Sequence, residues 1–280
     1  VINDEEKSVI DPHADKKSNA IEKRKVLLVE DNHELLNVLS NLFSSTYEVV
    51  MAHNGKEGLD KAHEEFPDII VSDIMMPEMT GIELCETIKS DFNLCHIPIV
   101  LLTALASTQQ NIEGLTKGAD DYITKPFNTS ILLVRCNNLV HNRLMLQKKF
   151  QQQGYTDTEV IANNPIDQHF LDALNSVIEN HIDDTEFNID HLACALGLSR
   201  SSLYAKFKSL TGITPNDYIL SKKIKRAAHL LQSTQLQITE ISDMLGFGSS
   251  RYFTRCFKKS FGIAPSEYRK KENSAEKLSE

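Results

Sequence analysis

The chain has 280 residues, of which 41% are hydrophobic and 25% are charged, and these values are ordinary for a soluble globular protein. This length predicts about two domains, and the sequence contains neither an apolar run of the ~18 residues that a membrane span needs nor a secretory signal. The five cysteines form no CxxC pair and the ten histidines show no ligand spacing, so we expect a reduced, cytoplasmic chain without a structural metal cluster.

The net charge of −9 hides an asymmetry between the two ends of the chain. Residues 26–140 carry 17 acids and 6 bases, a balance of −11, whereas residues 187–280 carry 8 acids and 15 bases, a balance of +7. An acidic module joined to a basic one suggests that only the C-terminal end meets a polyanion.

The N-terminal residues are polar, mixed in charge and free of aromatic residues, which is typical of a linker or tail. Because the chain begins at Val1 rather than Met, we expect it to be a piece of a longer protein. The predicted division is a linker or tail at 1–24, a first domain at 25–140, a helical extension and linker at 141–165, a second domain at 166–272 and a tail at 273–280.

Short apolar runs of strand length recur along the first domain. They are KVLLVED (25–31), YEVVMA (47–52), DIIVSD (68–73), IPIVLLTA (97–104) and DYIT (121–124). Segments with the apolar spacing of helices lie between them. Strands that alternate with helices predict an α/β doubly wound, five-stranded parallel sheet that is covered on both faces.

The ends of these predicted strands carry chemically related side chains. Glu30 and Asp31 end the first strand, Asp73 the third and Thr103 the fourth, while Lys125 follows the fifth. Because ligands bind at the carboxyl ends of parallel strands, we expect three carboxylates, a hydroxyl and an ammonium to converge on one edge of the sheet.

A long helix is predicted from Asn128 to about Gln153. It first covers the sheet and then becomes a polar connector. The pattern beyond residue 165 is helical throughout, so the second domain is expected to be all-α.

The second domain contains an internal repeat, in which residues 189–218 align with residues 238–268. Each copy reads as a short helix, a turn with glycine and a second helix with an apolar triplet on its core face. The triplets are Leu203, Phe207 and Leu210 in the first copy and Phe253, Phe257 and Phe261 in the second.

Two helices joined by a tight turn predict a helix-turn-helix motif, whose second helix enters the major groove of DNA. A helix over 215–234 would hold the two motifs at a fixed separation. Lys206, Lys208, Lys258, Lys259 and the KKIKR run (222–226) are expected to meet phosphate or solvent. The candidate DNA-binding residues are Ser201, Ser202 and Tyr204 in the first copy and Ser250, Arg251, Thr254, Arg255 and Lys258 in the second, with Arg251 and Arg255 as the base readers.

Residues 25–140 resemble the receiver domain of two-component response regulators. The resemblance rests on Glu30-Asp31, on SDIMMPEMTG around Asp73, on LLTA with Thr103 and on GADDYITKPF with Lys125. Residues 166–270 resemble the AraC-type DNA-binding domain through ITEISDMLG and GFGSSRYFTRCFKKSFGIAPSEYR. This combination resembles the C-terminal end of hybrid two-component regulators, in which a histidine kinase precedes the receiver on one membrane-anchored chain.

The receiver resemblance implies that Asp73 accepts a phosphoryl group from a histidine kinase and that Lys125 contacts the phosphoryl oxygens. It also implies a Mg²⁺ ion held by Glu30, Asp31, Asp73 and the backbone carbonyl of Met75, because crowded carboxylates need a dication. The bond between Lys125 and Pro126 is cis in the family.

The resemblance further implies a switch formed by Thr103 and Tyr122, which changes the surface of the fourth helix, fifth strand and fifth helix. Receivers of this class commonly form homodimers through that surface, and the paired regulator would bind double-stranded promoter DNA. Met75 and Leu105 occupy positions that tune hydrolysis of the aspartyl phosphate, and two apolar side chains there predict slow loss of phosphate.

There are two alternatives to this function. A haloacid-dehalogenase-type phosphatase also uses a strand-end aspartate, but it requires a second acid two residues later, where Met75 stands, so an enzyme is not expected. The second is a phosphorelay or protein-interaction receiver whose helical domain does not bind DNA.

Overall fold

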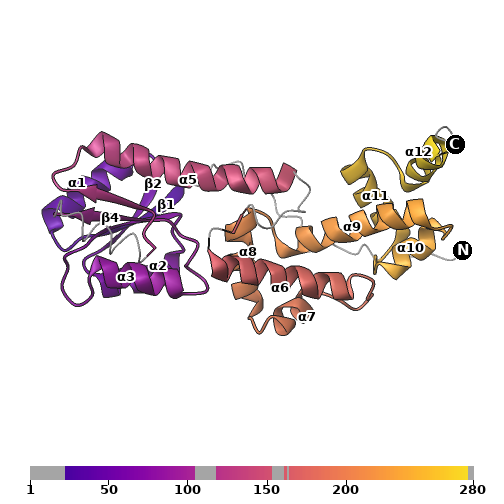
Figure 1. Cartoon of the computed structure of the whole chain (residues 1–280), viewed down its shortest axis with the longest axis horizontal. Helices are drawn as coiled ribbons and strands as arrows, with labels where there is room; N and C mark the ends of the chain where they lie inside the picture. The colour runs from indigo at the N-terminus through magenta and orange to yellow at the C-terminus, as the bar shows by residue number, and fades with distance from the viewer. Residues whose placement is uncertain (1–22, 105–117, 153–160, 163, 277–280) are drawn as a thin grey trace, which may run out of the picture.

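The computed structural model describes residues 23–104, 118–152, 161, 162 and 164–276. Most of the predicted N-terminal tail, part of the predicted linker and Leu105 lie outside these residues. Figure 1 shows an N-terminal part with a sheet between helices, followed by a helical C-terminal part.

The N-terminal part contains one sheet of five strands in the order β2-β1-β3-β4-β5. Every neighbouring pair is parallel, as the sequence predicts. The strands are β1 (Arg24–Val29), β2 (Tyr47–Ala52), β3 (Ile69–Asp73), β4 (Ile99–Thr103) and β5 (Asp121–Thr124).

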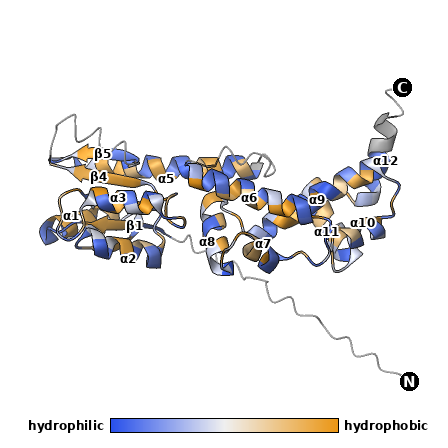
Figure 2. Ribbon diagram, turned by 60° about the horizontal axis from the view of Figure 1, so that its bottom comes forward, coloured by the Kyte–Doolittle hydropathy of each residue, from blue (hydrophilic) through white to orange (hydrophobic). Residues whose placement is uncertain are grey.

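Helices bury both faces of this sheet. Successive residues of β1 point to opposite faces, so Leu28 packs with α1 (His33–Phe43) and α5 (Thr129–Gln152). Leu27 packs on the other face with α2 (Gly55–Glu65) and α3 (Gly81–Ser90). Figure 2 shows the strands as largely hydrophobic, which agrees with a sheet that is covered on both sides.

Helix α5 belongs to two hydrophobic cores. Its N-terminal half packs on the sheet through Leu132 and Cys136. Near its C-terminal end, Phe150 is fully buried in the core of the helical part. The prediction that the C-terminal half of α5 is a polar connector is therefore wrong. Its apolar spacing is irregular, but Phe150 packs it into the core of the helical part.

The C-terminal part is helical in all of its described elements. They are α6 (Pro165–His181), α7 (Ile189–Ala195), α8 (Arg200–Thr211), α9 (Pro215–Ser233), α10 (Ile238–Met244), α11 (Ser250–Phe261) and α12 (Pro265–Glu276). Helices α7 and α8 form the first predicted motif, and α10 and α11 form the second.

Two separate cores lie along α9. Phe207 of α8 packs with Tyr218 at the start of α9, whereas Phe257 of α11 packs with Leu231 near its end. The predicted triplet of α8 is fully confirmed, but Phe261 of the α11 triplet is 37% exposed, and its ring lies 5.1 Å from the tilted ring of Tyr268 at the edge of the second core. The two motifs therefore sit at opposite ends of one helix (Figure 1).

Among the described residues, no helix is both long enough and apolar enough to span a lipid bilayer. The five cysteines are free thiols, and three of them are buried.

The loop after β3 depends on a close backbone approach at Gly81. The Gly81 N–H donates a 3.0 Å hydrogen bond to the carbonyl of Ile74, and Thr80 caps α3 together with Glu83. A Cβ atom on Gly81 would lie 2.0 Å from the carbonyl oxygen of Asp73. Only glycine lets α3 begin so close to the end of β3.

We expect Gly81→Ala to lower the free energy of unfolding of the N-terminal part by about 1–3 kcal/mol, because the added methyl group must displace backbone. Gly248→Ala is the matched control, since a Cβ there meets nothing within 4 Å. Chemical denaturation of both variants measures the difference. Equal stability of the two variants would contradict this account of the loop.

Candidate functional site

Three carboxylates meet at the carboxyl edge of the sheet. Glu30 and Asp31 directly follow β1, and Asp73 is the last residue of β3. One oxygen from each lies within 4.8 Å of the others. Glu30 is 2% exposed and Asp73 8%, while Asp31 is exposed to solvent. The parallel arrangement brings these residues together because β1 and β3 are hydrogen-bonded neighbours.

The ammonium group of Lys125 lies between two of these carboxylates. Its Nζ is 2.9 Å from Glu30 Oε2 and 3.0 Å from Asp73 Oδ1. Lys125 follows β5, and its backbone N–H donates to the carbonyl of Thr103 in β4. The peptide bond between Lys125 and Pro126 is cis, as the resemblance implied.

Burial and neighbouring charges shift the pKa values of this cluster. Burial raises the pKa of Glu30, the hydrogen bond from Lys125 opposes that shift, and the nearby Asp73 charge adds to it. Burial alone would lower the pKa of Lys125, but its hydrogen bonds to Glu30 and Asp73 outweigh that effect and raise it. Lys125 therefore stays charged where it faces Asp73.

The donor atoms fit a hard dication. Glu30, Asp31 and Asp73 offer carboxylate oxygens, the ligand type that Mg²⁺ prefers. One ammonium balances only one of three negative charges, so the cluster has room for further positive charge. Met75, whose backbone carbonyl is the fourth predicted ligand, has a side chain that is 67% exposed.

Of the two predicted switch residues, Thr103 lies beside this cluster and Tyr122 packs against the hydrophobic core on one face of the sheet. In the register of the sheet, Asp73 pairs with Leu102 and Thr103 pairs with Thr124, so Thr103 lies next to both Asp73 and Lys125. Thr103 is 4% exposed. The hydroxyl of Tyr122 is buried and has no hydrogen-bond partner among the described residues, and burial raises its pKa.

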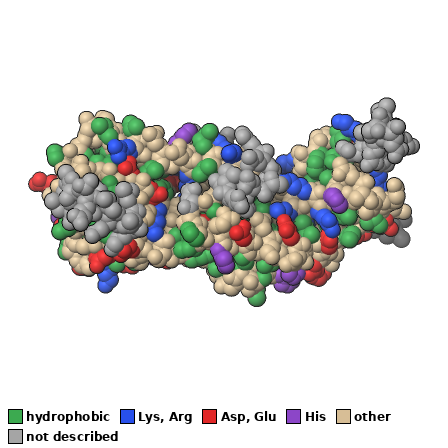
Figure 3. Space-filling model, viewed as in Figure 1, with side chains coloured by type: hydrophobic (Ala, Val, Ile, Leu, Met, Phe, Trp, Pro, Cys, Tyr) green, Lys and Arg blue, Asp and Glu red, His purple; other side chains and the backbone are tan. Residues whose placement is uncertain are grey.

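Helix α11 presents most of its predicted DNA-binding residues to solvent. Arg251, Arg255 and Lys258 are exposed, whereas Ser250 and Thr254 are half-buried and Thr254 donates to the carbonyl of Ser250. Figure 3 shows several Lys and Arg side chains over the neighbouring α9.

Sequence reasoning missed Tyr252 in the same helix. This residue is 41% exposed, and the guanidinium of Arg255 lies 5.3 Å from the centre of its ring. The spacing of three residues in a helix was the signal that a Tyr–Arg pair would form. Both side chains are exposed, so the pair lies on the outer face of α11.

Helix α8 differs from α11, although the two are copies of one motif. Ser201 is exposed, and the Tyr204 hydroxyl accepts a hydrogen bond from Asn216 at 2.6 Å. Ser202, however, donates a 3.0 Å hydrogen bond to the side chain of Asn93 in the N-terminal part.

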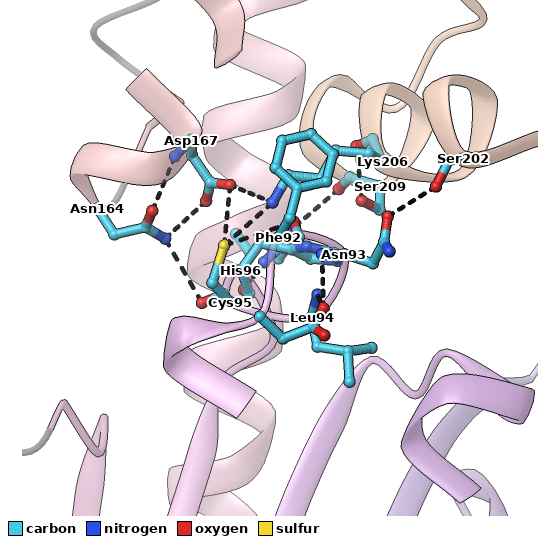
Figure 4. Close-up of polar contacts among 12 residues, drawn as sticks. Phe92, Asn93, Leu94, Cys95, His96, Asn164, Asp167, Ser202, Lys206 and Ser209 are labelled. Atoms are coloured by element: carbon cyan, nitrogen blue, oxygen red, sulfur yellow. Dashed lines mark hydrogen bonds and ion pairs between the residues drawn. The ribbon is translucent and has the colours of Figure 1, made fainter. Parts of the chain in front are cut away.

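The expectation that Lys206 and Lys223 meet phosphate or solvent is wrong, and Lys223 of α9 is 8% exposed. Lys206 is buried (1% exposed) and forms an ion pair with Asp167 of α6. Its ammonium also contacts Cys95 Sγ at 3.1 Å and lies over the ring of Phe92 (Figure 4). The pattern of α8 could not reveal this, because every partner is distant in the sequence.

Comparison with known proteins agrees with the two parts of the structure. Residues 26–137 match the family model described as the response regulator receiver domain, and residues 192–271 match the one described as a helix-turn-helix domain. The chain is 39% identical over 247 residues to "Histidine kinase P4" of Formosa agariphila, a match that covers 88% of this chain but 18% of that protein.

Two solved receiver domains match the N-terminal part. One, from a signal transduction histidine kinase of Syntrophus aciditrophicus, is 34% identical and covers 42% of this chain and 90% of its own, with a TM-score of 0.41. The other, from a sensor histidine kinase of Pseudomonas aeruginosa, holds a magnesium ion in its active-site cleft. It is 28% identical and covers 42% of this chain and 98% of its own, with a TM-score of 0.40.

The acidic edge of the sheet, the paired helical motifs and the matches to both families lead to one conclusion. This chain contains a receiver domain of the response-regulator family, followed by an AraC-type helix-turn-helix domain.

Proposed function

We propose that this chain is a phosphorylation-controlled transcription regulator. The receiver accepts a phosphoryl group on Asp73 from a histidine kinase, and the tandem helix-turn-helix domain binds promoter DNA in response. The observation that carries the proposal is the position of Lys125, whose ammonium lies 3.0 Å from Asp73 and 2.9 Å from Glu30.

The chemistry follows from these side chains. A carboxylate oxygen of Asp73 attacks the phosphorus of a phosphohistidine, and the new O–P bond forms as the N–P bond breaks. The imidazole leaves with the electron pair of that bond. Lys125 is placed to contact the phosphoryl oxygens as a positive charge, which is how such transfers are mainly stabilised.

Glu30, Asp31 and Asp73, with the backbone carbonyl of Met75, would hold Mg²⁺ at this edge. When bound, the ion would neutralise the charge on the carboxylates and on the phosphoryl oxygens. The side chains themselves position the nucleophile, because Asp73 is the last residue of a fully buried strand.

Thr103 and Tyr122 form the proposed switch. After phosphorylation, the Thr103 hydroxyl donates to a phosphoryl oxygen, and Tyr122 packs behind it. The Tyr122 hydroxyl supports this role, because it is buried without a hydrogen-bond partner among the described residues, and such burial costs about 1–3 kcal/mol.

Receiver pairing would convert this switch into DNA binding. The face formed by β5 and α5 carries an exposed ion pair between Asp121 and Arg135, at 2.9 Å, beside Ile131 and Val134, which are 53% and 56% exposed. A second copy would cover these apolar side chains. Pairing also doubles the DNA site and raises the effective concentration of each reader.

The helical domain supplies the DNA contacts. Helix α9 has 19 residues, which corresponds to a length of about 28 Å, close to the roughly 34 Å of one helical turn of DNA. Two motifs at its ends could therefore reach successive major grooves. Arg251 and Arg255 are the proposed base readers, because arginine pairs with guanine O6 and N7.

The proposed function also implies a kinase partner and a cellular location. The similar histidine kinase suggests that the kinase is part of the same parent chain, although a separate kinase would serve the same chemistry. We place the receiver and the DNA-binding domain in the cytoplasm, where DNA is reached, while the parent chain is anchored in the inner membrane.

We expect Asp73→Asn to abolish labelling by a small phosphodonor such as acetyl phosphate, because the nucleophilic oxygen is lost.

On the unsubstituted 280-residue chain, the phosphate on Asp73 should persist for minutes or longer, since the exposed Met75 side chain cannot orient water. Met75→Asn should shorten that lifetime several-fold, whereas Met51→Asn, at an exposed position on β2, should not. A phosphate lifetime of seconds on the unsubstituted chain would refute the proposed role of Met75.

Arg255→Ala should weaken binding to a selected duplex by about 1–3 kcal/mol and relax the preference at one base position. The control is Lys56→Ala, which removes an equal charge from an exposed site on α2. Binding constants for the duplex and its single-base variants check this. A uniform loss across all of the variants would reassign Arg255 to the phosphate backbone.

Affinity for duplex DNA should fall steeply as salt rises, because lysine and arginine contacts to phosphate release counterions. Titrations at several salt concentrations measure the slope. If no DNA binding is found even at low salt, the helical domain serves a phosphorelay or protein-interaction module instead.

A further inference from the structure

The receiver contacts the reading helix of the first motif directly. Ser202 donates to Asn93, which lies between α3 and β4, and Arg143 of α5 donates to the carbonyl of Ser209 at 2.9 Å. Lys206, between these two serines, is covered by Phe92 and Cys95 (Figure 4). Residues 202, 206 and 209 share one face of α8, because they are spaced by four and three residues.

The second copy of the motif serves as an internal reference. At an offset of 50 residues, Ser202, Lys206 and Ser209 correspond to Tyr252, Cys256 and Lys259 in α11. Tyr252 and Lys259 are exposed and Cys256 is half-buried. The same face is therefore more open in the copy that lacks a receiver contact, whereas in α8 the receiver covers it together with Asp167 of α6.

The adjoining face of α8 is also turned toward the receiver. Ala205 and Lys208 line a cavity of about 620 Å³, whose opposite wall includes Arg24, Phe66 and Asp68 of the receiver. A volume of this size holds a small molecule. It does not admit a DNA duplex, since a reading helix needs a groove about 12 Å wide with a phosphate backbone on either side.

We propose that the receiver masks the first reading helix, so that residues 92–96 of the receiver and duplex DNA compete for the same surface of α8. This inference rests on the proposed DNA-binding function. In the masked state only α11 is free to read DNA, and the chain has half of its reading surface.

The masking surface lies at the opposite end of the sheet from the phosphorylation site. Asp68 and residue 97 stand just before β3 and β4, and Arg24 begins β1. Asp73 and Lys125 lie at the carboxyl ends of the strands, about 16 Å away along a five-residue strand. Phosphorylation of Asp73 therefore does not touch the mask, and DNA must displace it.

The test uses the full chain with Asp73→Ala, which removes phosphorylation. Adding Asn93→Arg replaces the acceptor of the Ser202 hydrogen bond by a bulky cation next to Phe92, on which Lys206 lies, and should open the contact without altering the helical domain. The probe is a duplex selected from a random pool with the Asp73→Ala chain. We expect Asn93→Arg to bind it at least tenfold more tightly than the Asp73→Ala chain.

Asn41→Arg is the matched control, because it adds the same charge at an exposed position on α1. Equal affinity of the Asn93→Arg and Asn41→Arg chains would overturn the mask. If neither variant nor the Asp73→Ala chain binds DNA at low salt, it is the proposed DNA-binding function that fails.

A second experiment compares two states of one variant, so it does not depend on equal folding of two proteins. Asn93→Cys and Ser202→Cys are combined with Cys194→Ser and Cys256→Ser, which remove the two cysteines that are not buried. Mild oxidation should link residues 93 and 202 in the free chain, reduce DNA affinity at least tenfold and be reversed by a reductant. Saturating DNA should slow the cross-link. Failure to cross-link, or undiminished DNA affinity of the linked chain, would overturn the proposal.

Discussion

The ion pairs of Lys125 with Asp73 and Glu30 are the interaction on which the receiver depends. A parallel sheet brings strand ends to one edge, and in this chain that edge collects three carboxylates within 4.8 Å. Without a nearby cation, the burial of Glu30 and Asp73 would leave charges that a protein interior tolerates poorly. Lys125 supplies that cation from the end of β5, and its ammonium stands where a phosphoryl oxygen would need one. Lys125 thus stabilises the buried carboxylates and is also the residue proposed to contact the phosphoryl group.

This part of the molecule is readable from sequence because its determinants are local. Each strand is a short apolar run, and the residue that follows it lands at the carboxyl edge whatever the rest of the chain does. The placement of Glu30, Asp73 and Lys125 therefore needs only the order of the strands. The need for glycine at position 81 is local in the same way, because the backbone that a Cβ would meet is the Asp73 carbonyl in the same loop.

The contact between the domains is not readable in this way. Lys206 lies on a basic helix, where a lysine is ordinarily solvated, and nothing within α8 distinguishes it from Lys208. Its burial depends on Asp167, 39 residues earlier, and on Phe92 and Cys95, more than 110 residues earlier. The burial of Phe150 leaves no local signal for the same reason, because its pocket belongs to the core that α6, α7, α8 and the start of α9 form. Long-range burial of single side chains leaves no periodic signal.

The duplication of the motif gives the two copies different tasks. The first core takes in Phe150 from α5 and is joined to the receiver, whereas the second contains only residues of α9 to α12. A ligand shifts an equilibrium only by its difference in affinity for the two states, and a phosphoryl group on Asp73 touches none of the masking residues. In the proposed model the coupling passes through a second copy of the chain. Paired receivers would bring two α11 helices to one DNA site, and the effective concentration gained in that way would let DNA compete with the receiver for α8.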